Sequence, residues 1–315
     1  MRLAYCASNL SVLLLLFSGC DMSTDGSAGD APGEPDANPA DDAAPPADGS
    51  ADGGDSGPTR YVDLIFPPEQ LVVVRDILYA TVTDDYGTHR LLLDLYRPGD
   101  DPVSDRPAIV WVHGGNFDSG NRKMMAGYAR EFARRGYVTA SIEYRLLKAM
   151  DPDKGPQEAA EVAQEDVDTA MDWLTRHAAE YGIDPTRFIV GGHSAGSITS
   201  FQVGYRYEDA GHAAPTVIGV AALEGVLIEP EDFAAGDPPF ILIRSGGQDS
   251  GGRDCPTGDC EWIFTELIEA ADALGIANEM THIPGATHVD LIKPQFVPGI
   301  SAIVAPFLYD NALNP

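Results

Sequence analysis

The chain is poor in basic residues and in cysteine. Its 315 residues include 20 lysines and arginines against 49 aspartates and glutamates, which gives a formal net charge of −29 at pH 7. A nucleic-acid-binding surface needs a positive field, so this balance argues against DNA or RNA as a partner. The acidity is better explained by solubility than by a specific partner.

Several motifs that hold cofactors or metals are also missing. The sequence contains no P-loop, no His-Glu-x-x-His pair and no dinucleotide-binding glycine pattern. Its four cysteines are not accompanied by a second Cys or His pair at zinc spacing. We therefore expect neither a cofactor nor a metal ion.

Residues 1–20 have the features of an export signal rather than of a membrane span. Arg2 is followed by an apolar run over 10–17 that is too short to cross a bilayer. Phe17-Ser18-Gly19-Cys20 resembles a lipobox, which predicts cleavage before Cys20 and lipidation of that cysteine. The sequence thus predicts an exported protein anchored to a bacterial membrane, on its periplasmic or cell-surface side. An ordinary secretory signal with a chance cysteine is the alternative.

Residues 21–58 differ in composition from all that follows. They are rich in Asp, Ala, Gly, Pro and Ser, and include ten acidic residues but no basic or aromatic one. Such a segment buries too little apolar surface to offset its chain entropy, and its like charges repel. We interpret it as a disordered acidic tether. The remaining residues, 59–315, suit one α/β domain with a large core.

Within 59–315, apolar runs typical of strands alternate with stretches of helical periodicity. The first two strands, joined by a turn at 84–87, predict an antiparallel hairpin. The later alternation predicts a mostly parallel central sheet with helices on both faces. The expected strands are 72–82, 90–96, 107–112, 137–142, 187–191, 217–223, 239–243 and 277–283. The expected helices are 122–135, 158–181, one from 194, 261–274 and 297–309.

The pentapeptide Gly192-His193-Ser194-Ala195-Gly196 lies between an expected strand and an expected helix. Gly-x-Ser-x-Gly in that context is typical of a nucleophile elbow, a sharp turn that holds a serine hydroxyl clear of the backbone. The flanking glycines suit a turn that brings neighbouring chain too close for a Cβ atom. We therefore predict Ser194 as a nucleophile.

A serine nucleophile needs a base, and His288 is our candidate. In enzymes with such an elbow the chain order is Ser, then Asp or Glu, then His, so only three histidines qualify. His212 precedes most candidate acids, and His282 lies inside an expected strand. His288 follows that strand in a loop, at the edge of the sheet where ligand chemistry gathers.

The acid that orients the base should also follow a strand. Asp249 does so in the turn Ser245-Gly-Gly-Gln-Asp, whose glycines let the carboxylate reach the elbow. Asp254, a few residues later, and Glu224, at the end of the previous strand, stay open as alternatives.

Acyl transfer further requires donors for the developing oxyanion. One is expected to be the backbone N–H of Ala195, at the start of the elbow helix. The others are expected in His113-Gly114-Gly115-Asn116-Phe117, which follows a buried strand. We assign the amides of Gly115 and Asn116 as donors, with His113 and Gly114 supporting the loop.

The two remaining cysteines lie five residues apart. Cys255 and Cys260 enclose Pro-Thr-Gly-Asp and can close a small disulfide loop in an oxidising compartment.

These motifs together resemble the esterase/lipase branch of the α/β-hydrolase fold. The resemblance covers nearly all of 72–312. It rests on His-Gly-Gly-Asn-Phe at 113–117, on Tyr144-Arg145-Leu146, and on the stretch from Asp166 to Ala195. The chain is similar to bacterial carboxylesterases near the hormone-sensitive-lipase and feruloyl-esterase-like groups. The resemblance implies a triad of Ser194, Asp249 and His288. Asn116 stands where hormone-sensitive-lipase-like enzymes usually carry a third glycine. The resulting His-Gly-Gly-x-aromatic form is nearer to the feruloyl-esterase-like and kynurenine-formamidase-like groups.

The sequence therefore predicts a serine carboxylesterase that acts on a small-molecule ester. The short stretch after Leu223 leaves little chain for a lid, which favours short or soluble esters. An amidase or formamidase, or a carbohydrate deacylase, would use the same triad. A lipid-anchored binding protein without catalysis is the alternative from another class. The sequence does not predict an oligomeric state.

Overall fold

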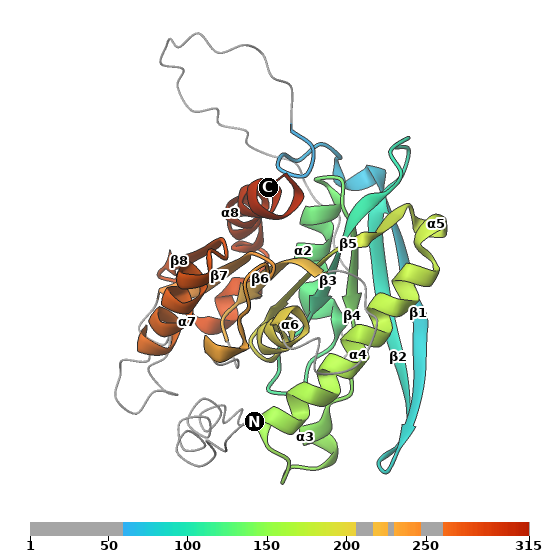
Figure 1. The fold of residues 1–315 in the computed structure, drawn as a ribbon. Helices are drawn as coiled ribbons and strands as arrows, with labels where there is room; N and C mark the ends of the chain where they lie inside the picture. Colours follow the sequence, from blue (N-terminus) through green and yellow to red (C-terminus); the bar gives the residue numbers. More distant parts are fainter. Residues whose placement is uncertain (1–58, 206–216, 226–229, 247–260, 315) are drawn as a thin grey trace.

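The computed structural model describes residues 59–205, 217–225, 230–246 and 261–314, which fold around one eight-stranded sheet (Figure 1). The strand order is β1-β2-β4-β3-β5-β6-β7-β8. The strands are β1 (Leu71–Asp84), β2 (Gly87–Pro98), β3 (Arg106–Val112), β4 (Val138–Ile142), β5 (Ile183–His193), β6 (Val217–Leu223), β7 (Phe240–Gly246) and β8 (Asn278–Pro284).

The pairing of the strands confirms the predicted mostly parallel sheet with an antiparallel leading hairpin. β1 pairs antiparallel with β2, and β2 pairs antiparallel with β4. From β4 onward the strands are parallel. The carboxyl ends of β3, β5, β6 and β7 therefore meet at one edge of the sheet, and the segments that follow them lie side by side there.

The helices lie near the predicted positions, with some differences at their ends. The long predicted helix is divided into α4 and α5, and Gly182 in the left-handed region (φ 72°) ends the second of them. The α-helices are α2 (Ala126–Ala133), α3 (Leu147–Met150), α4 (Pro156–Arg176), α5 (Ala178–Tyr181), α6 (Ala195–Tyr205), α7 (Glu261–Leu274) and α8 (Val297–Leu308). Short turns of other helix types are η1 (Pro68–Gln70), η2 (Arg122–Met125), η4 (Pro230–Asp232), η5 (His288–Ile292) and η6 (Tyr309–Leu313).

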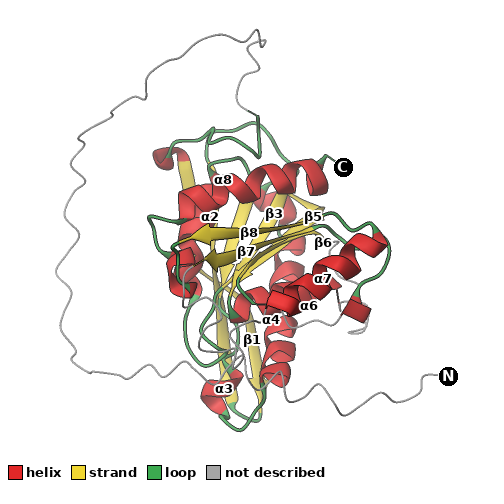
Figure 2. Ribbon diagram, turned by 90° about the vertical axis from the view of Figure 1, so that its left-hand side faces the viewer, coloured by secondary structure: helices red, strands yellow, loops and turns green. Residues whose placement is uncertain are grey.

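Helices cover both faces of the sheet, and each face has its own core. α2 and α8 pack on one face, around Trp111, Tyr128 and Phe132. α4, α6 and α7 pack on the other, where Phe201 and Phe240 meet. Figure 2 shows the sheet between these two layers. All residues of β3 are buried, as expected for a continuous apolar strand covered on both faces.

In the part of the chain that the structure describes, no helix is long and apolar enough to cross a membrane.

The turn from β5 into α6 brings α6 against the end of β3 with no space for a side chain. A Cβ atom built on Gly196 would overlap the carbonyl oxygen of Val112, and one built on Gly192 would overlap the backbone of Gly196. These atoms belong to backbone segments that the sheet holds in place. Only glycine fits at either position, which is why the sequence has both.

Replacing Gly196 with alanine tests this close approach. We expect Gly196→Ala to lower the free energy of unfolding by about 2 kcal/mol, because the new methyl group has no room and backbone must shift. Gly299→Ala is the matched control, since Gly299 lies exposed in α8 with open space around its missing Cβ. The control should gain about 0.5 kcal/mol from lower chain entropy. Equal stability of both variants in urea unfolding would contradict the packing described.

Candidate active site

Ser194 lies in a strained turn at the carboxyl edge of the sheet. It follows β5 directly, and its φ of 54° places it in the left-handed region, which costs a residue other than glycine about 1–3 kcal/mol. Two backbone hydrogen bonds hold it there. Its N–H donates to the carbonyl of Leu223 (2.9 Å), and its carbonyl accepts from the N–H of Ile198 (3.1 Å). The predicted elbow is therefore present in the backbone geometry.

The loop predicted to supply oxyanion donors lies against this serine. A Cβ atom built on Gly114 would lie 3.1 Å from Cβ of Ser194 and 2.8 Å from Nδ1 of His193. Gly115, Asn116 and Phe117 follow with φ values of 120°, 53° and 61°. Three successive left-handed residues turn the loop sharply at the end of β3. Such a turn exposes successive amides on one side of the chain.

Among the described residues, the three predicted donor amides donate no hydrogen bond. In the described part of the chain, the N–H groups of Gly115 and Asn116 donate to no carbonyl or side-chain oxygen. Ala195 is the first residue of α6, so its N–H has no partner within that helix. The carbonyl of Gly115 accepts from the N–H groups of Asp118 and Ser119 (both 3.0 Å), which closes the loop behind these amides.

The ring of His113 contacts both this loop and Tyr144. Its ring is buried, stacks on Tyr144 with centroids 4.4 Å apart, and has Nδ1 2.7 Å from the carbonyl oxygen of Gly114. A carbonyl oxygen only accepts, so Nδ1 carries the proton and donates. Burial lowers the pKa of His113 from 6.5 to about 4, with the hydrogen bond to Gly114 acting in the opposite direction. His113 is therefore neutral at pH 7.

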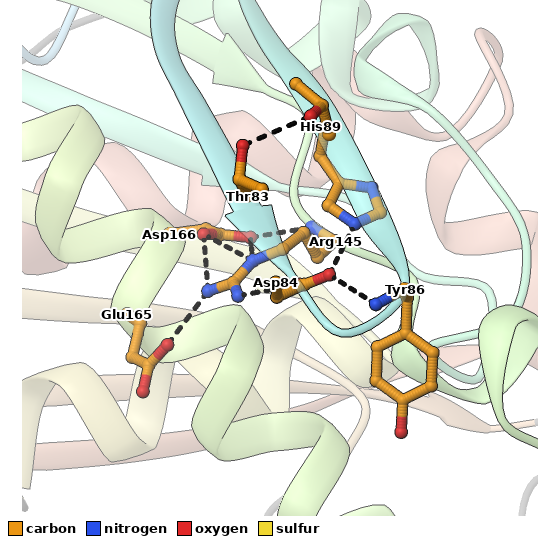
Figure 3. A network of polar contacts seen from close by, with 8 residues as sticks. Thr83, Asp84, Tyr86, His89, Arg145, Glu165 and Asp166 are labelled. Carbon is orange, nitrogen blue, oxygen red and sulfur yellow. Dashed lines mark hydrogen bonds and ion pairs between the residues drawn. The ribbon is translucent and has the colours of Figure 1, made fainter.

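A buried ion-pair network fixes the segment that carries Tyr144 (Figure 3). The Tyr144 hydroxyl donates to the carbonyl of His113 (3.0 Å). The next residue, Arg145, donates to Asp166 on α4 from both its backbone N–H (2.7 Å) and Nε (3.0 Å). Its guanidinium also pairs with Glu165 (2.8 Å) and with Asp84 at the tip of β1 (3.3 Å). The network therefore supports the loop at 113–117 through the Tyr144 segment.

His288 enters the same region from the loop after β8. It begins the 3₁₀ turn η5, where the Asp290 carboxylate accepts from the N–H (2.8 Å) and the hydroxyl (2.7 Å) of Thr287. His193 Nε2 lies 2.8 Å from the carbonyl oxygen of His288, and the two rings are 4.7 Å apart. The structure thus brings His288 beside the residue that precedes Ser194. Among the contacts of these described residues there is no hydrogen bond from the Ser194 hydroxyl to the His288 ring. Catalytic hydrogen bonds are often long without substrate.

Asp249, the preferred acid, lies outside the described residues. So do Asp254, Cys255, Cys260, Cys20 and His212, and their predicted roles stay predictions. Glu224, the remaining candidate acid, is described. It follows β6 with a φ of 55° and is buried. One carboxylate oxygen accepts from the N–H of Ser245, and the other lies 3.3 Å from Nε of Arg244. Both oxygens are therefore occupied at the ends of β6 and β7. His282, the other candidate base, lies exposed within β8 as expected.

Two supporting residues were not assigned a role from the sequence. Tyr144 belongs to the Tyr-Arg-Leu segment of the resemblance, but nothing in one sequence says that its hydroxyl bonds His113. His193 is the variable position of the pentapeptide, so the motif itself gives it no role. Their contacts join segments that are 31 and 95 residues apart in the sequence, and only the fold reveals them.

Solved structures of esterases share this architecture. The structure of an esterase from Thermogutta terrifontis, Est2, superimposes with a TM-score of 0.59, 22% identity, and coverage of 77% of this chain and 93% of that one. The chain has the α/β-hydrolase fold. Within that fold, Ser194 follows β5, the loop predicted to supply oxyanion donors follows β3, and His288 follows β8. At this level of identity the likeness shows the fold.

Sequence comparisons agree with the α/β-hydrolase fold. Residues 93–215 match the BD-FAE family model. Carboxylesterase NlhH of Mycobacterium tuberculosis is 31% identical over 165 residues, which cover 51% of this chain and 48% of that protein. The chlorogenic acid esterase of Aspergillus niger is 26% identical over 146 residues, which cover 44% of this chain and 27% of that protein. The chain spans less than half the length of the curated relatives it matches.

The depressed pKa of His113 predicts a pH-dependent loss of stability. The unfolded chain binds a proton here below pH 6.5, whereas the folded chain does so only near pH 4. The stability that neutral His113 contributes is therefore fully present above pH 6.5, and it falls as the pH is lowered. From His113 alone we expect a loss of about 2 kcal/mol in the free energy of unfolding between pH 8 and pH 5.

His113→Asn keeps a donor near Gly114 but removes the titration. Urea unfolding at several pH values should therefore show a shallower acid dependence for the variant than for the parent. Parallel curves for the two proteins between pH 8 and pH 5 would contradict the assignment.

Proposed function

We propose that the chain is a serine carboxylesterase with Ser194 as nucleophile and His288 as base. The observation that carries the proposal is the strained turn at Ser194. It packs against a loop whose Gly115 and Asn116 amides have no acceptor among the described residues, and it lies next to the segment that bears His288. A left-handed φ at a residue other than glycine persists only where the surroundings impose it, and it is typical of functional sites. The esterases among the related proteins support the same reaction type.

In the proposed reaction, His288 takes the proton of the Ser194 hydroxyl as its oxygen attacks the ester carbonyl. The carbonyl oxygen becomes an oxyanion, which the amides of Gly115, Asn116 and Ala195 stabilise. Donors of this kind are worth roughly 3 kcal/mol each in other enzymes. His288 then passes the proton to the alcohol oxygen, the carbon–oxygen bond breaks, and the acyl group stays on Ser194. Water repeats the sequence and releases the acid.

Short or soluble esters are the proposed substrate class. The stretch between β6 and η4 is short, and little chain is available there for a large lid. Est2 of Thermogutta terrifontis has been solved with propionate and with butyrate bound, which supports an acyl group of this size for a protein of the same fold. Asn116 stands at the loop position where hormone-sensitive-lipase-like enzymes usually carry a third glycine, and the motif leaves the alcohol side of the substrate undefined.

Hydrolysis of p-nitrophenyl butyrate tests the proposal. We expect measurable kcat/KM for the parent protein and a loss of at least about 10³-fold in Ser194→Ala, because no other group in the site attacks the carbonyl. Ser200→Ala is a matched control, since Ser200 is buried in α6 and its hydroxyl donates to the carbonyl of Gly196 (2.8 Å). The control should keep most of the activity. Equal rates for Ser194→Ala and the parent would rule out the proposed nucleophile.

The same assay assigns the acid. Asp249→Asn should lower kcat by about 10²–10⁴-fold, because the amide cannot orient and stabilise the charged imidazole. Asp254→Asn should stay near the parent value. Glu224→Gln should change thermal stability more than kcat, because its carboxylate pairs with Arg244. A larger loss of kcat in Asp254→Asn or Glu224→Gln than in Asp249→Asn would transfer the role to that residue.

A further inference from the structure

His193 occupies the junction of the three segments that form the site. It is the last residue of β5 and precedes the nucleophile. Its side chain is buried, with 3% of its surface exposed. On one side its Nε2 is 2.8 Å from the carbonyl oxygen of His288. On the other side its Nδ1 lies against Gly114, where a Cβ atom would come within 2.8 Å of it. The reaction proposed above assigns no role to this ring.

The hydrogen bonds determine which nitrogen of His193 carries the proton. A carbonyl oxygen only accepts, so Nε2 must be the donor to His288. Nδ1 is buried and has no hydrogen-bond partner among the described residues. A proton on Nδ1 would place a buried N–H against Gly114 with no acceptor in reach, at a substantial cost. The neutral ring protonated at Nε2 is therefore the form that fits the site.

The lowered pKa of His193 agrees with this assignment. Burial first, and then the charge of His288, lower the pKa of His193 from 6.5 to about 3, while the hydrogen bond to the His288 carbonyl acts in the opposite direction. A neutral neighbour also suits a base that gains positive charge during the reaction. A second imidazolium 4.7 Å from the His288 ring would oppose that charge.

We propose that His193 is a positioning residue for the base, which fixes the backbone of His288 relative to Ser194 through its Nε2–H donor. The proposal rests on the esterase function proposed above. Ser194 and His288 belong to segments that enter the site from β5 and from the loop after β8. The hydrogen bond ties the residue next to the nucleophile directly to the main chain of the base. It therefore sets the distance across which the proton moves.

Two substitutions of His193 test whether its hydrogen-bond donor or only its volume is needed. His193→Leu fills similar space without a hydrogen-bond donor. Because small errors in the position of the base are costly, kcat for p-nitrophenyl butyrate should fall about 10–100-fold, and KM should change less than about 3-fold. His193→Gln places an amide N–H near the position of Nε2 and should recover most of the lost kcat. His177→Leu is the control. His177 ends α4, beyond the amino end of β5, and its loss should leave kcat unchanged.

Histidine ¹⁵N NMR tests the contact without any activity. At pH 7 the spectrum of the parent should contain a neutral ring protonated at Nε2 that disappears in His193→Gln. His113 provides an internal comparison, because its contact with Gly114 requires the opposite tautomer, protonated at Nδ1. A His193 ring protonated at Nδ1, or charged at pH 7, would overturn the proposal. Thermal unfolding measured by circular dichroism checks that the variants compared have equal thermal stability.

The outcomes distinguish the two proposals. An inactive parent protein defeats the esterase function and, with it, the role of His193 in that reaction. An active parent with equal kcat losses in His193→Leu and His193→Gln defeats only the positioning role, since the ring then merely fills space. An active parent with His193→Leu at the parent rate defeats it as well. Selective rescue by glutamine, together with the Nε2–H tautomer, supports it.

Discussion

The site depends on one close approach of backbone, where α6 meets the end of β3. Gly192 and Gly196 allow the chain to reverse there without side chains, and Gly196 lies directly against the carbonyl of Val112. The parallel pairing of β3 with β5 holds both sides of this contact in place. The turn leaves Ser194 with a left-handed backbone, and the surrounding sheet maintains that strain. A serine in a relaxed turn would have no fixed direction relative to the loop after β3.

Around this contact, each chemical group is held by a different kind of interaction. The loop proposed to bind the oxyanion is held by the stacked pair of His113 and Tyr144. Tyr144 is followed by Arg145, whose buried ion pair with Asp166 reaches α4. Removing one partner of such a pair is costly because it leaves an uncompensated buried charge. The segment of His288, the proposed base, is held by the hydrogen bond from His193. The supports thus come from α4 and from the segments that follow the strands of the sheet.

The sequence predicts the fold well because its signals are local and strong. Continuous apolar runs such as Pro107–Val112 correspond to strands buried on both faces, and their alternation with helices predicts the parallel pairing that the structure shows from β4 onward. Element ends are less predictable. β5 begins at Ile183, earlier than its apolar run, because Ile183 pairs with Arg106 across the sheet. The long helical stretch divides near His177, whose backbone leaves the helical conformation (φ −105°, ψ 14°) and whose ring nitrogen Nδ1 donates to the carbonyl of Trp173.

The candidate site was predictable where a motif constrains the backbone, and it was not where contacts join distant segments. Glycine spacing identified Ser194 and the loop at 113–117, because close approaches require glycine. The roles of Tyr144 and His193 depend on hydrogen bonds to the carbonyls of His113 and His288, which no local pattern encodes. The choice among Asp249, Asp254 and Glu224 depends on which carboxylate reaches a ring from another loop, which is again a matter of tertiary geometry.

The most direct measurement is a crystal structure of residues 59–315 after reaction with an alkyl fluorophosphonate, which mimics the tetrahedral intermediate. The account predicts phosphorus bonded to Oγ of Ser194, with the phosphoryl oxygen within hydrogen-bond distance of the amides of Gly115, Asn116 and Ala195. It also predicts a nitrogen of the His288 ring beside the phosphonate. Phosphorus on another residue, or a phosphoryl oxygen directed away from those amides, would contradict it.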